Sequence, residues 1–117
     1  MSAIPRILLI SHLPELHYDK VLAVRGFEVV TATSLTEGFT LWRPFHFDLV
    51  LIVVDGDTEA ATKFCAELKA LDPKQNVAFV TGWHTYVPPS ACPDEVIQRE
   101  HGPSTFLRKV AELVEIQ

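Results

Sequence analysis

Three short apolar runs constrain the fold of this chain more than any other feature. They are RILLIS (6–11), FDLVLIVV (47–54) and NVAFVT (76–81). Apolar residues at consecutive positions in a run this short are typical of a strand that is buried on both faces. Two β-branched segments, FEVVT (27–31) and EVIQR (95–99), predict two more strands. The chain is therefore expected to build a five-stranded sheet.

Helical patterns separate or follow these strands, over residues 15–25, 34–43, 58–71 and from Ser104 onward. Ser34 and Glu37 form a capping box, in which the hydroxyl and the carboxylate each satisfy a free backbone donor. Asp57 is a good N-cap for the third helix. Residues that stop helices are Gly26, Pro44 and Pro73. The apolar faces at helical spacing are Leu16, Val21, Leu22 and Val24; Ala61, Phe64, Cys65, Leu68 and Leu71; and Phe106, Leu107, Val110, Leu113 and Val114.

Strands that alternate with helices predict parallel pairing through right-handed crossovers. The expected fold is an α/β, flavodoxin-like, doubly wound sheet in a single domain over residues 1–117, with strand order 2-1-3-4-5. In such sheets ligands bind beside the carboxyl ends of the strands. The residues expected at that edge are Ser11, His12, the segment from Val53 to Asp57, Thr81, Gly82 and Arg99.

The composition excludes several function classes. Net charge is −5 with scattered Lys and Arg, so no basic stripe is present for nucleic acid or an anionic membrane. No apolar run approaches the length of a membrane span, and the first strand lacks the cleavage site of a signal peptide. We therefore expect a cytoplasmic protein whose Cys65 and Cys92 are reduced thiols. No glycine-rich phosphate loop or nucleophile elbow is present, so no cofactor is predicted.

Taken together, these motifs resemble the receiver (CheY-like) domain of bacterial two-component response regulators. RILLI resembles the first strand of that family, and FDLVLIVVD resembles its third strand, which usually reads DLVLLD. VAFVTG resembles the fourth strand with its switch Thr or Ser. DEVIQREHGPSTFLRKVAELV resembles the end of the domain, where a short strand leads to a Lys-Pro pair and the last helix. The resemblance covers nearly the whole chain and lies mainly in the hydrophobic pattern.

The resemblance implies that the acidic part of the family's phosphorylation site is lost. In the family, two acidic residues after the first strand and a phosphoacceptor Asp after the third hold Mg²⁺, which prefers hard oxygen ligands. Here the acidic pair falls on Ser11 and His12, and the acceptor position, aligned from Asp48, falls on Val53. A valine cannot accept a phosphoryl group, and Ser with His is a poor magnesium site. The resemblance thus implies a pseudo-receiver without a metal or catalytic residues.

The other family positions are partly kept. A Thr or Ser and a Lys contact the phosphoryl group in the family. Thr81 matches the first of these, whereas the Lys position falls on Arg99. The Pro after the Lys falls on Glu100, and the aromatic switch residue before it falls on Val96. Arg99 together with Thr81 could still hold a phosphate or a carboxylate.

Asp55 leaves an alternative open. A bulge or a two-residue register slip in the third strand would bring Asp55 to the acceptor place, because Val53 and Asp55 lie on the same side of a strand. That would give an atypical phosphorylatable receiver. We favour the interpretation of Asp55-Gly56-Asp57 as a turn that ends a strand and caps a helix.

Two enzyme or metal interpretations rest on weaker patterns. Ser11, His12 and Asp55 contain the residue types of a hydrolytic triad, but a triad is defined by geometry and not by adjacency in sequence. The chain is therefore expected not to be an enzyme, with a small ligand-binding or enzymatic module that uses the strand-end crevice as the alternative. The candidate ligands for a zinc site are His84, Cys92 and His101. Their spacing matches no compact zinc-binding pattern.

The segment 82–93 contains Gly82, Pro88, Pro89 and Pro93, which predicts an irregular loop. The helix that receivers carry there is expected to be shortened or missing. The loop residues that could anchor a protein interface, or fold back over the sheet, are Trp83, Tyr86 and Val87. We therefore expect a stand-alone receiver-like signalling protein that acts by protein–protein contact with a histidine kinase, another regulator or itself, including as a homodimer.

Overall fold

Five parallel strands form one sheet. The computed structural model describes residues 4–12, 17–44, 46–56, 58–82, 85, 87 and 92–115. The strands lie in the order β2-β1-β3-β4-β5, and every neighbouring pair is parallel. Their bounds are β1 Arg6–Ile10, β2 Glu28–Ala32, β3 Leu49–Val54, β4 Val77–Thr81 and β5 Glu95–Gln98. The predicted α/β class and strand order are confirmed.

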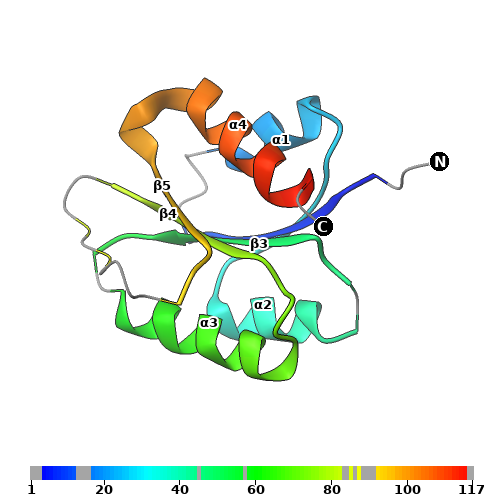
Figure 1. Cartoon of the computed structure of the whole chain (residues 1–117), viewed down its shortest axis with the longest axis vertical. Helices are drawn as coiled ribbons and strands as arrows, with labels where there is room; N and C mark the ends of the chain where they lie inside the picture. The colour runs from blue at the N-terminus through cyan, green and yellow to red at the C-terminus, as the bar shows by residue number, and fades with distance from the viewer. Residues whose placement is uncertain are drawn as a thin grey trace.

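Two helices cover each face of the sheet (Figure 1). One face carries α1 (Tyr18–Val24) and α4 (Gly102–Glu115), and the other carries α2 (Leu35–Trp42) and α3 (Glu59–Leu71). A short 3₁₀ turn, η2 (Arg99–His101), joins β5 to α4. The described residues between β4 and β5 contain no helix, as the sequence predicts for this connection. Within the described residues, no helix has both the length and the apolar character needed to cross a membrane.

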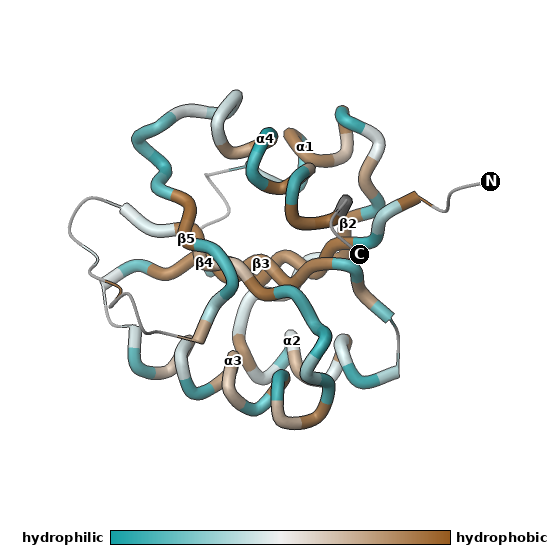
Figure 2. The backbone as a smooth tube through the Cα atoms, viewed as in Figure 1, coloured by the Kyte–Doolittle hydropathy of each residue, from teal (hydrophilic) through white to brown (hydrophobic). Residues whose placement is uncertain are grey.

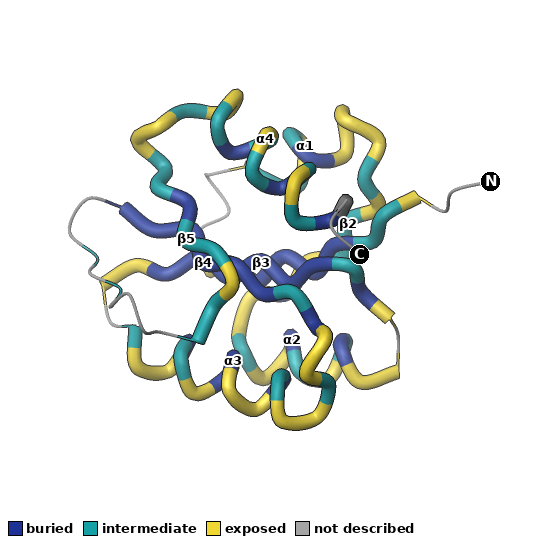
Figure 3. The backbone as a smooth tube through the Cα atoms, viewed as in Figure 1, coloured by how far each residue is buried: buried dark blue, intermediate teal, exposed yellow. Residues whose placement is uncertain are grey.

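The central strand β3 is buried along its whole length because helices lie on both sides of it. Its side chains alternate between two hydrophobic clusters. Figures 2 and 3 show apolar, buried strands between helices with polar, exposed outer surfaces. The α2/α3 cluster includes Val50, Ile52, Val54, Phe64, Cys65 and Phe79. The α1/α4 cluster includes Leu9, Leu51, Val53, Val80, Phe106 and Val110.

The capping box at the start of α2 is confirmed, with one difference in its partner. The Ser34 hydroxyl accepts a hydrogen bond from the Glu37 backbone N–H at 3.1 Å. The Glu37 carboxylate reaches one residue further back and accepts from the Thr33 N–H at 2.7 Å. Two donors that a helix start leaves without an intrahelical partner are therefore satisfied, and α2 begins at the predicted place.

Several sequence expectations on the first and third helices are wrong. α1 begins at Tyr18 and not at residue 15, because His17 precedes it with a left-handed φ of 53°. Val24 and Leu71, predicted on apolar helix faces, are 85% and 63% exposed. Each is the last residue of its helix, so no following turn shields it. The predicted N-cap Asp57 lies outside the described residues, and Thr58 occupies the N-cap of α3.

Candidate functional site

A small pocket opens where β1 and β3 end. Its volume is about 150 Å³. The residues that line it are Ile10, Ser11, His12, Thr33, Ser34, Leu35, Ile52, Val53, Val54 and Asp55. The structure thus brings together four of the residues that the sequence singles out. Thr81 and Arg99 are not among the described residues that line this pocket.

Val53 lies inside the sheet. It is the fifth residue of β3, it pairs in register with Val80 of β4, and its side chain is 5% exposed within the α1/α4 cluster. Its neighbour Val54 enters the α2/α3 cluster on the opposite face. At the position where the resemblance puts a phosphoacceptor, the protein therefore has a packed aliphatic side chain.

Thr81 lies on the other face of the sheet from Val53. It pairs in register with Val54 and is 1% exposed. Side chains alternate along a strand, so Thr81 shares the face of Phe79, two residues earlier in β4, which belongs to the α2/α3 cluster. The structure therefore does not place Thr81 and Val53 on one face.

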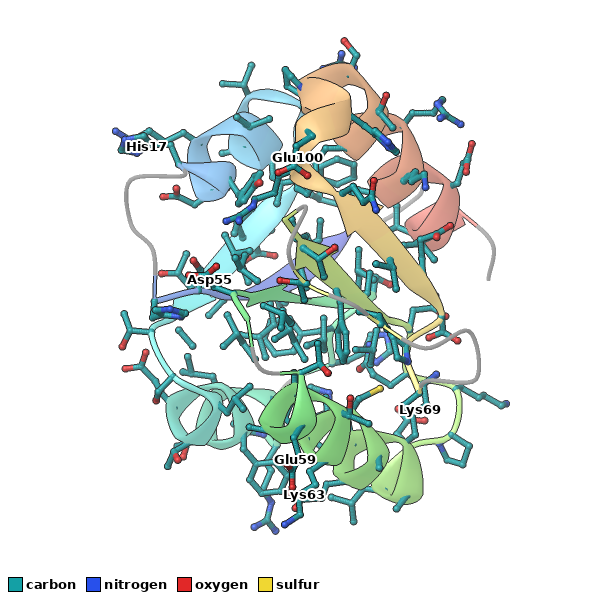
Figure 4. The ribbon with its side chains drawn as sticks, turned by 90° about the vertical axis from the view of Figure 1, so that its left-hand side faces the viewer. His17, Asp55, Glu59, Lys63, Lys69 and Glu100 are labelled. Carbon is teal, nitrogen blue, oxygen red and sulfur yellow. The ribbon has the colours of Figure 1, made fainter. Side chains whose placement is uncertain are left out.

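Arg99 connects the end of β5 to the end of β3. Its Nη2 lies 3.9 Å from Oδ1 of Asp55, and its side chain is 23% exposed. The guanidinium also lies against the backbone of Gly82, where a Cβ atom would overlap Nη2. Because the Asp55 side chain is 54% exposed, water and salt screen this ion pair, and it contributes little to stability. Figure 4 shows Asp55 at the end of β3, between the two helical layers.

Tyr18 is a site neighbour that sequence reasoning missed. Its ring stacks on Phe106 with a centroid distance of 4.8 Å. Burial raises the pKa of the Tyr18 phenol, the charge of Arg99 lowers it, and the charge of Glu100 raises it. Tyr18 and Arg99 line a cavity of about 240 Å³ between α1 and α4. No spacing in the sequence signals this contact, because it depends on how α1 and η2 meet above the sheet.

A second cavity lies on the other side of Tyr18, towards β2. Its volume is about 330 Å³, and it separates the start of α1 from the ends of β1 and β2. Ser11 lines both this cavity and the β1–β3 pocket. The remaining lining residues are Leu9, His17, Tyr18, Asp19, Lys20, Thr31 and Ala32. The described lining residues thus combine single polar groups with an apolar floor.

Metal-binding chemistry finds little support at this edge. Among the residues that the structure describes, no group of three or more His, Cys, Asp or Glu side chains could hold a metal ion. Ser11, His12 and Asp55 share the β1–β3 pocket, and Asp55 is the one carboxylate among the described residues that line it. The expected zinc alternative includes His84, which lies outside the described residues.

The loop after β4 folds back on the protein where it is described. Val87 packs against the α2/α3 cluster, which is one of the two roles expected for it. The Thr85 hydroxyl accepts a hydrogen bond from the Gly56 N–H at 3.2 Å and so ties this loop to the β3–α3 connection. The proposed interface residues Trp83 and Tyr86 lie outside the described residues.

Comparison with solved structures identifies the fold. A CheY-like response regulator receiver domain protein from Methanospirillum hungatei JF-1 is 22% identical, with 97% of this chain and 95% of that chain covered and a TM-score of 0.78. The response regulator TrrA from Thermotoga maritima, solved in complex with Mg²⁺-BeF, is 19% identical, with coverages of 94% and 99% and a TM-score of 0.81. A LuxR family DNA-binding response regulator from Silicibacter pomeroyi is 23% identical, with coverages of 96% and 93% and a TM-score of 0.76.

Sequence comparisons add no closer relative. No model of a known protein family and no curated protein matches the chain. At identities of 19% to 23%, the structural similarity identifies the fold and does not transfer an activity. The chain has the fold of the CheY-like receiver domains of response regulators.

Proposed function

We propose that this chain is a receiver-like protein of signal transduction that recognises other proteins and does not accept a phosphoryl group. The observation that carries the proposal is Val53, which is 5% exposed and packed in the α1/α4 cluster at the acceptor position. An aliphatic side chain has no nucleophilic atom. Phosphorylation therefore has no acceptor at this place in the sheet.

The surroundings of Val53 support the same proposal. Phosphoryl transfer in receivers needs Mg²⁺ to neutralise charge on the transferring group. Mg²⁺ binds hard oxygen ligands, above all carboxylates, and keeps near-octahedral geometry. Ser11 and His12 supply one hydroxyl and one imidazole to the β1–β3 pocket in place of two carboxylates. Among the described lining residues, a metal here would be held mainly by Asp55 and would bind weakly.

A second candidate function uses Asp55. Its side chain is 54% exposed, it lines the β1–β3 pocket, and it lies 3.9 Å from Arg99. An accessible carboxylate beside a guanidinium is the arrangement that would favour either an atypical phosphorylatable receiver or a small ligand-binding module. The Arg99 guanidinium also packs against Gly82 and pairs with Asp55. Because Asp55 partly neutralises its charge, Arg99 attracts an anionic ligand less strongly.

The partner we propose is a protein of the same signalling class, namely a histidine kinase, another regulator or a second copy of this chain. The net charge of −5 disfavours nucleic acid and anionic membranes as partners. The surface we propose for the partner is the β4–β5 connection, whose described residues contain no helix and whose Val87 packs against the α2/α3 cluster. A changed surface and a lost phosphorylation site are consistent with binding that does not depend on phosphate.

The test is intact-mass measurement after incubation with Mg²⁺ and acetyl phosphate, with an amide NMR titration by Mg²⁺ and beryllofluoride in parallel. We expect no added phosphoryl mass and no shifts near Ser11, Asp55 and Thr81. The matched control variant is Asp55→Asn, which keeps the size of the side chain and removes its nucleophile. A phosphoryl adduct in the natural chain that is lost in Asp55→Asn would refute the proposal and establish the second candidate.

A further inference from the structure

Two cysteines from distant parts of the sequence lie in one hydrophobic cluster beside α3. Cys65 lies in the middle of α3 and is 0% exposed. Cys92 comes just before β5, is half-buried, and packs against the α2/α3 cluster that contains Cys65. Both are free thiols, and Cys92 lies close enough to Cys65 to raise the pKa of its thiol.

An ion pair fixes the same two segments against each other. Lys69 follows Cys65 by one helical turn, and Asp94 follows Cys92 by two residues. The Lys69 Nζ lies 2.7 Å from Oδ2 of Asp94, and that oxygen also accepts a hydrogen bond from the Val77 N–H at 2.8 Å. Figure 4 shows Lys69 on α3. The segments that carry the two thiols are therefore held against each other by other bonds.

Hydrogen bonds to backbone carbonyls also hold these two segments together. The Asp94 N–H donates to the Val77 carbonyl at 2.8 Å, and the Lys69 ammonium donates to the Gln75 carbonyl at 3.0 Å. The chain that carries Cys92 is thus bonded to α3 and to the start of β4. Holding two reactive groups in contact raises their effective concentration far above that of free thiols in solution.

The two sulfur atoms differ in accessibility. Burial raises the pKa of the Cys65 thiol, and the neighbouring Cys92 raises it further. Cys65 therefore stays protonated and out of contact with solvent. Cys92 is the thiol that a dissolved oxidant reaches first.

We propose that Cys65 and Cys92 form a redox modification site, at which a hydroperoxide converts the two thiols into an intramolecular disulfide. In the first step the Cys92 sulfur attacks the peroxide oxygen, the O–O bond breaks, and Cys92 becomes a sulfenic acid while an alcohol, or water from hydrogen peroxide, is released. In the second step the Cys65 sulfur displaces the hydroxyl group from Cys92, its proton leaves with that group as water, and the S–S bond forms. The two electrons lost by the thiols reduce the peroxide.

The disulfide would join α3 covalently to the residue that leads into β5. This inference does not depend on the proposed signalling function, because it uses only the contact between the two thiols. Its physical consequence is that residues 65–92, from the middle of α3 through β4, become a covalently closed loop. The oxidised chain then has fewer unfolded conformations than the reduced chain.

The first test uses the full chain and hydrogen peroxide at equimolar concentration. We expect an intact-mass loss of about 2 Da, reversed by a thiol reductant, and a monomer on a non-reducing gel. Peptide mapping should find one crosslink, between Cys65 and Cys92. The Cys92→Ser variant, altered at the half-buried position, should keep the fold and show no mass loss. Stable oxygen adducts on Cys92 without a crosslink, disulfide-linked dimers, or no reaction would each overturn the proposal.

A second measurement separates a structural contact from chance pairing. Both the native chain and the chain in concentrated urea are equilibrated with oxidised and reduced glutathione, and the fraction of Cys65–Cys92 disulfide is measured by mass. Because the fold holds the thiols together, we expect the equilibrium constant for disulfide formation to be at least about tenfold higher in the native chain. A native value equal to or below the unfolded value would overturn the proposal, because the fold would then not favour the bond.

Discussion

The substitution Val53→Asp restores a carboxylate at the position that the family resemblance assigns to the phosphoacceptor. Val53 is 5% exposed and shares the α1/α4 cluster with Leu9, Leu51 and Val80. These neighbours offer no hydrogen bond to an acid. We therefore expect the substitution to destabilise the sheet and not to create a working acceptor site.

The expected loss of stability has two parts. Removing the buried apolar side chain of Val53 costs about 1.5–3 kcal/mol. Enclosing a carboxyl group among apolar side chains costs roughly 1–3 kcal/mol more, even when the group is protonated. The free energy of unfolding should therefore fall by about 3–6 kcal/mol, which lowers the Tm of a domain of this size by roughly 10–25 °C.

The pH dependence of this loss has a definite sign. Burial raises the pKa of the introduced carboxyl above its unfolded value of about 3.9. Between the unfolded and the folded pKa, the folded state binds more protons than the unfolded state, so the free energy of unfolding falls as pH rises through that window. The Tm difference between the natural chain and Val53→Asp should therefore be smaller near pH 4 than near pH 7.

The assay is thermal unfolding followed by circular dichroism at both pH values, with intact-mass measurement after Mg²⁺ and acetyl phosphate. Val53→Asn is the matched control, because it has the size of Asp and no charge to titrate. We expect its Tm loss to be the same at both pH values. A Val53→Asp variant with unchanged Tm, or with no pH dependence of its Tm loss, would show that Val53 lies in a solvated site. Robust phosphoryl labelling of the variant would show that Ser11 and His12 suffice as partners for phosphorylation.

Two further substitutions test contacts of the site and of the core. Gly82→Ala puts a Cβ onto the Arg99 guanidinium, which can swing away, so the free energy of unfolding should change by less than about 1 kcal/mol. The NMR signals of the Arg99 side chain should shift in the same variant. A loss of more than roughly 3 kcal/mol in the free energy of unfolding would mean that the arginine is held rigidly. Trp42→Phe removes the indole N–H that donates to the buried Gln75 Oε1 at 2.9 Å, and denaturant unfolding should show a loss of about 1–3 kcal/mol. Replacing Gln75 by Leu in the Trp42→Phe background should recover part of that loss, and no recovery would contradict the assignment of the loss to an unpaired amide.

The sheet could be predicted because its information is local and repeated. Each buried strand is a short apolar run, and the helices between them fix parallel pairing. The capping box at Ser34 gives the start of α2 for the same reason, since two side chains three residues apart satisfy donors of the same turn. Helix ends are less predictable, as Val24 and Leu71 show: an apolar residue at the correct spacing is buried only if the helix continues past it or the sheet extends to it.

The candidate site could be predicted only in part, because it depends on contacts between elements. Sequence reasoning placed Ser11, His12, Val53 and Asp55 at one edge, and the structure gives them a common pocket. Sequence reasoning could not show that Thr81 lies on the face opposite Val53. That follows from the register between β3 and β4, and aligned sequence positions do not contain this register. The packing of Cys92 against the cluster of Cys65 was hidden in the same way, since Cys65 was expected in the core but nothing in the sequence indicates where Cys92 packs.

The position of Val53 would also explain how a receiver fold can persist if the proposed loss of phosphorylation is correct. A cluster of carboxylates at the strand ends is destabilising, because like charges in close contact raise one another's pKa and resist burial. A fold that carries such a cluster gives up stability at that edge for function. Here β3 extends through Val53 and Val54, and both side chains join hydrophobic clusters, one on each face of the sheet. If the proposed function is correct, an edge that would hold acidic residues has become part of the core, and selection then acts on the surface that partners contact.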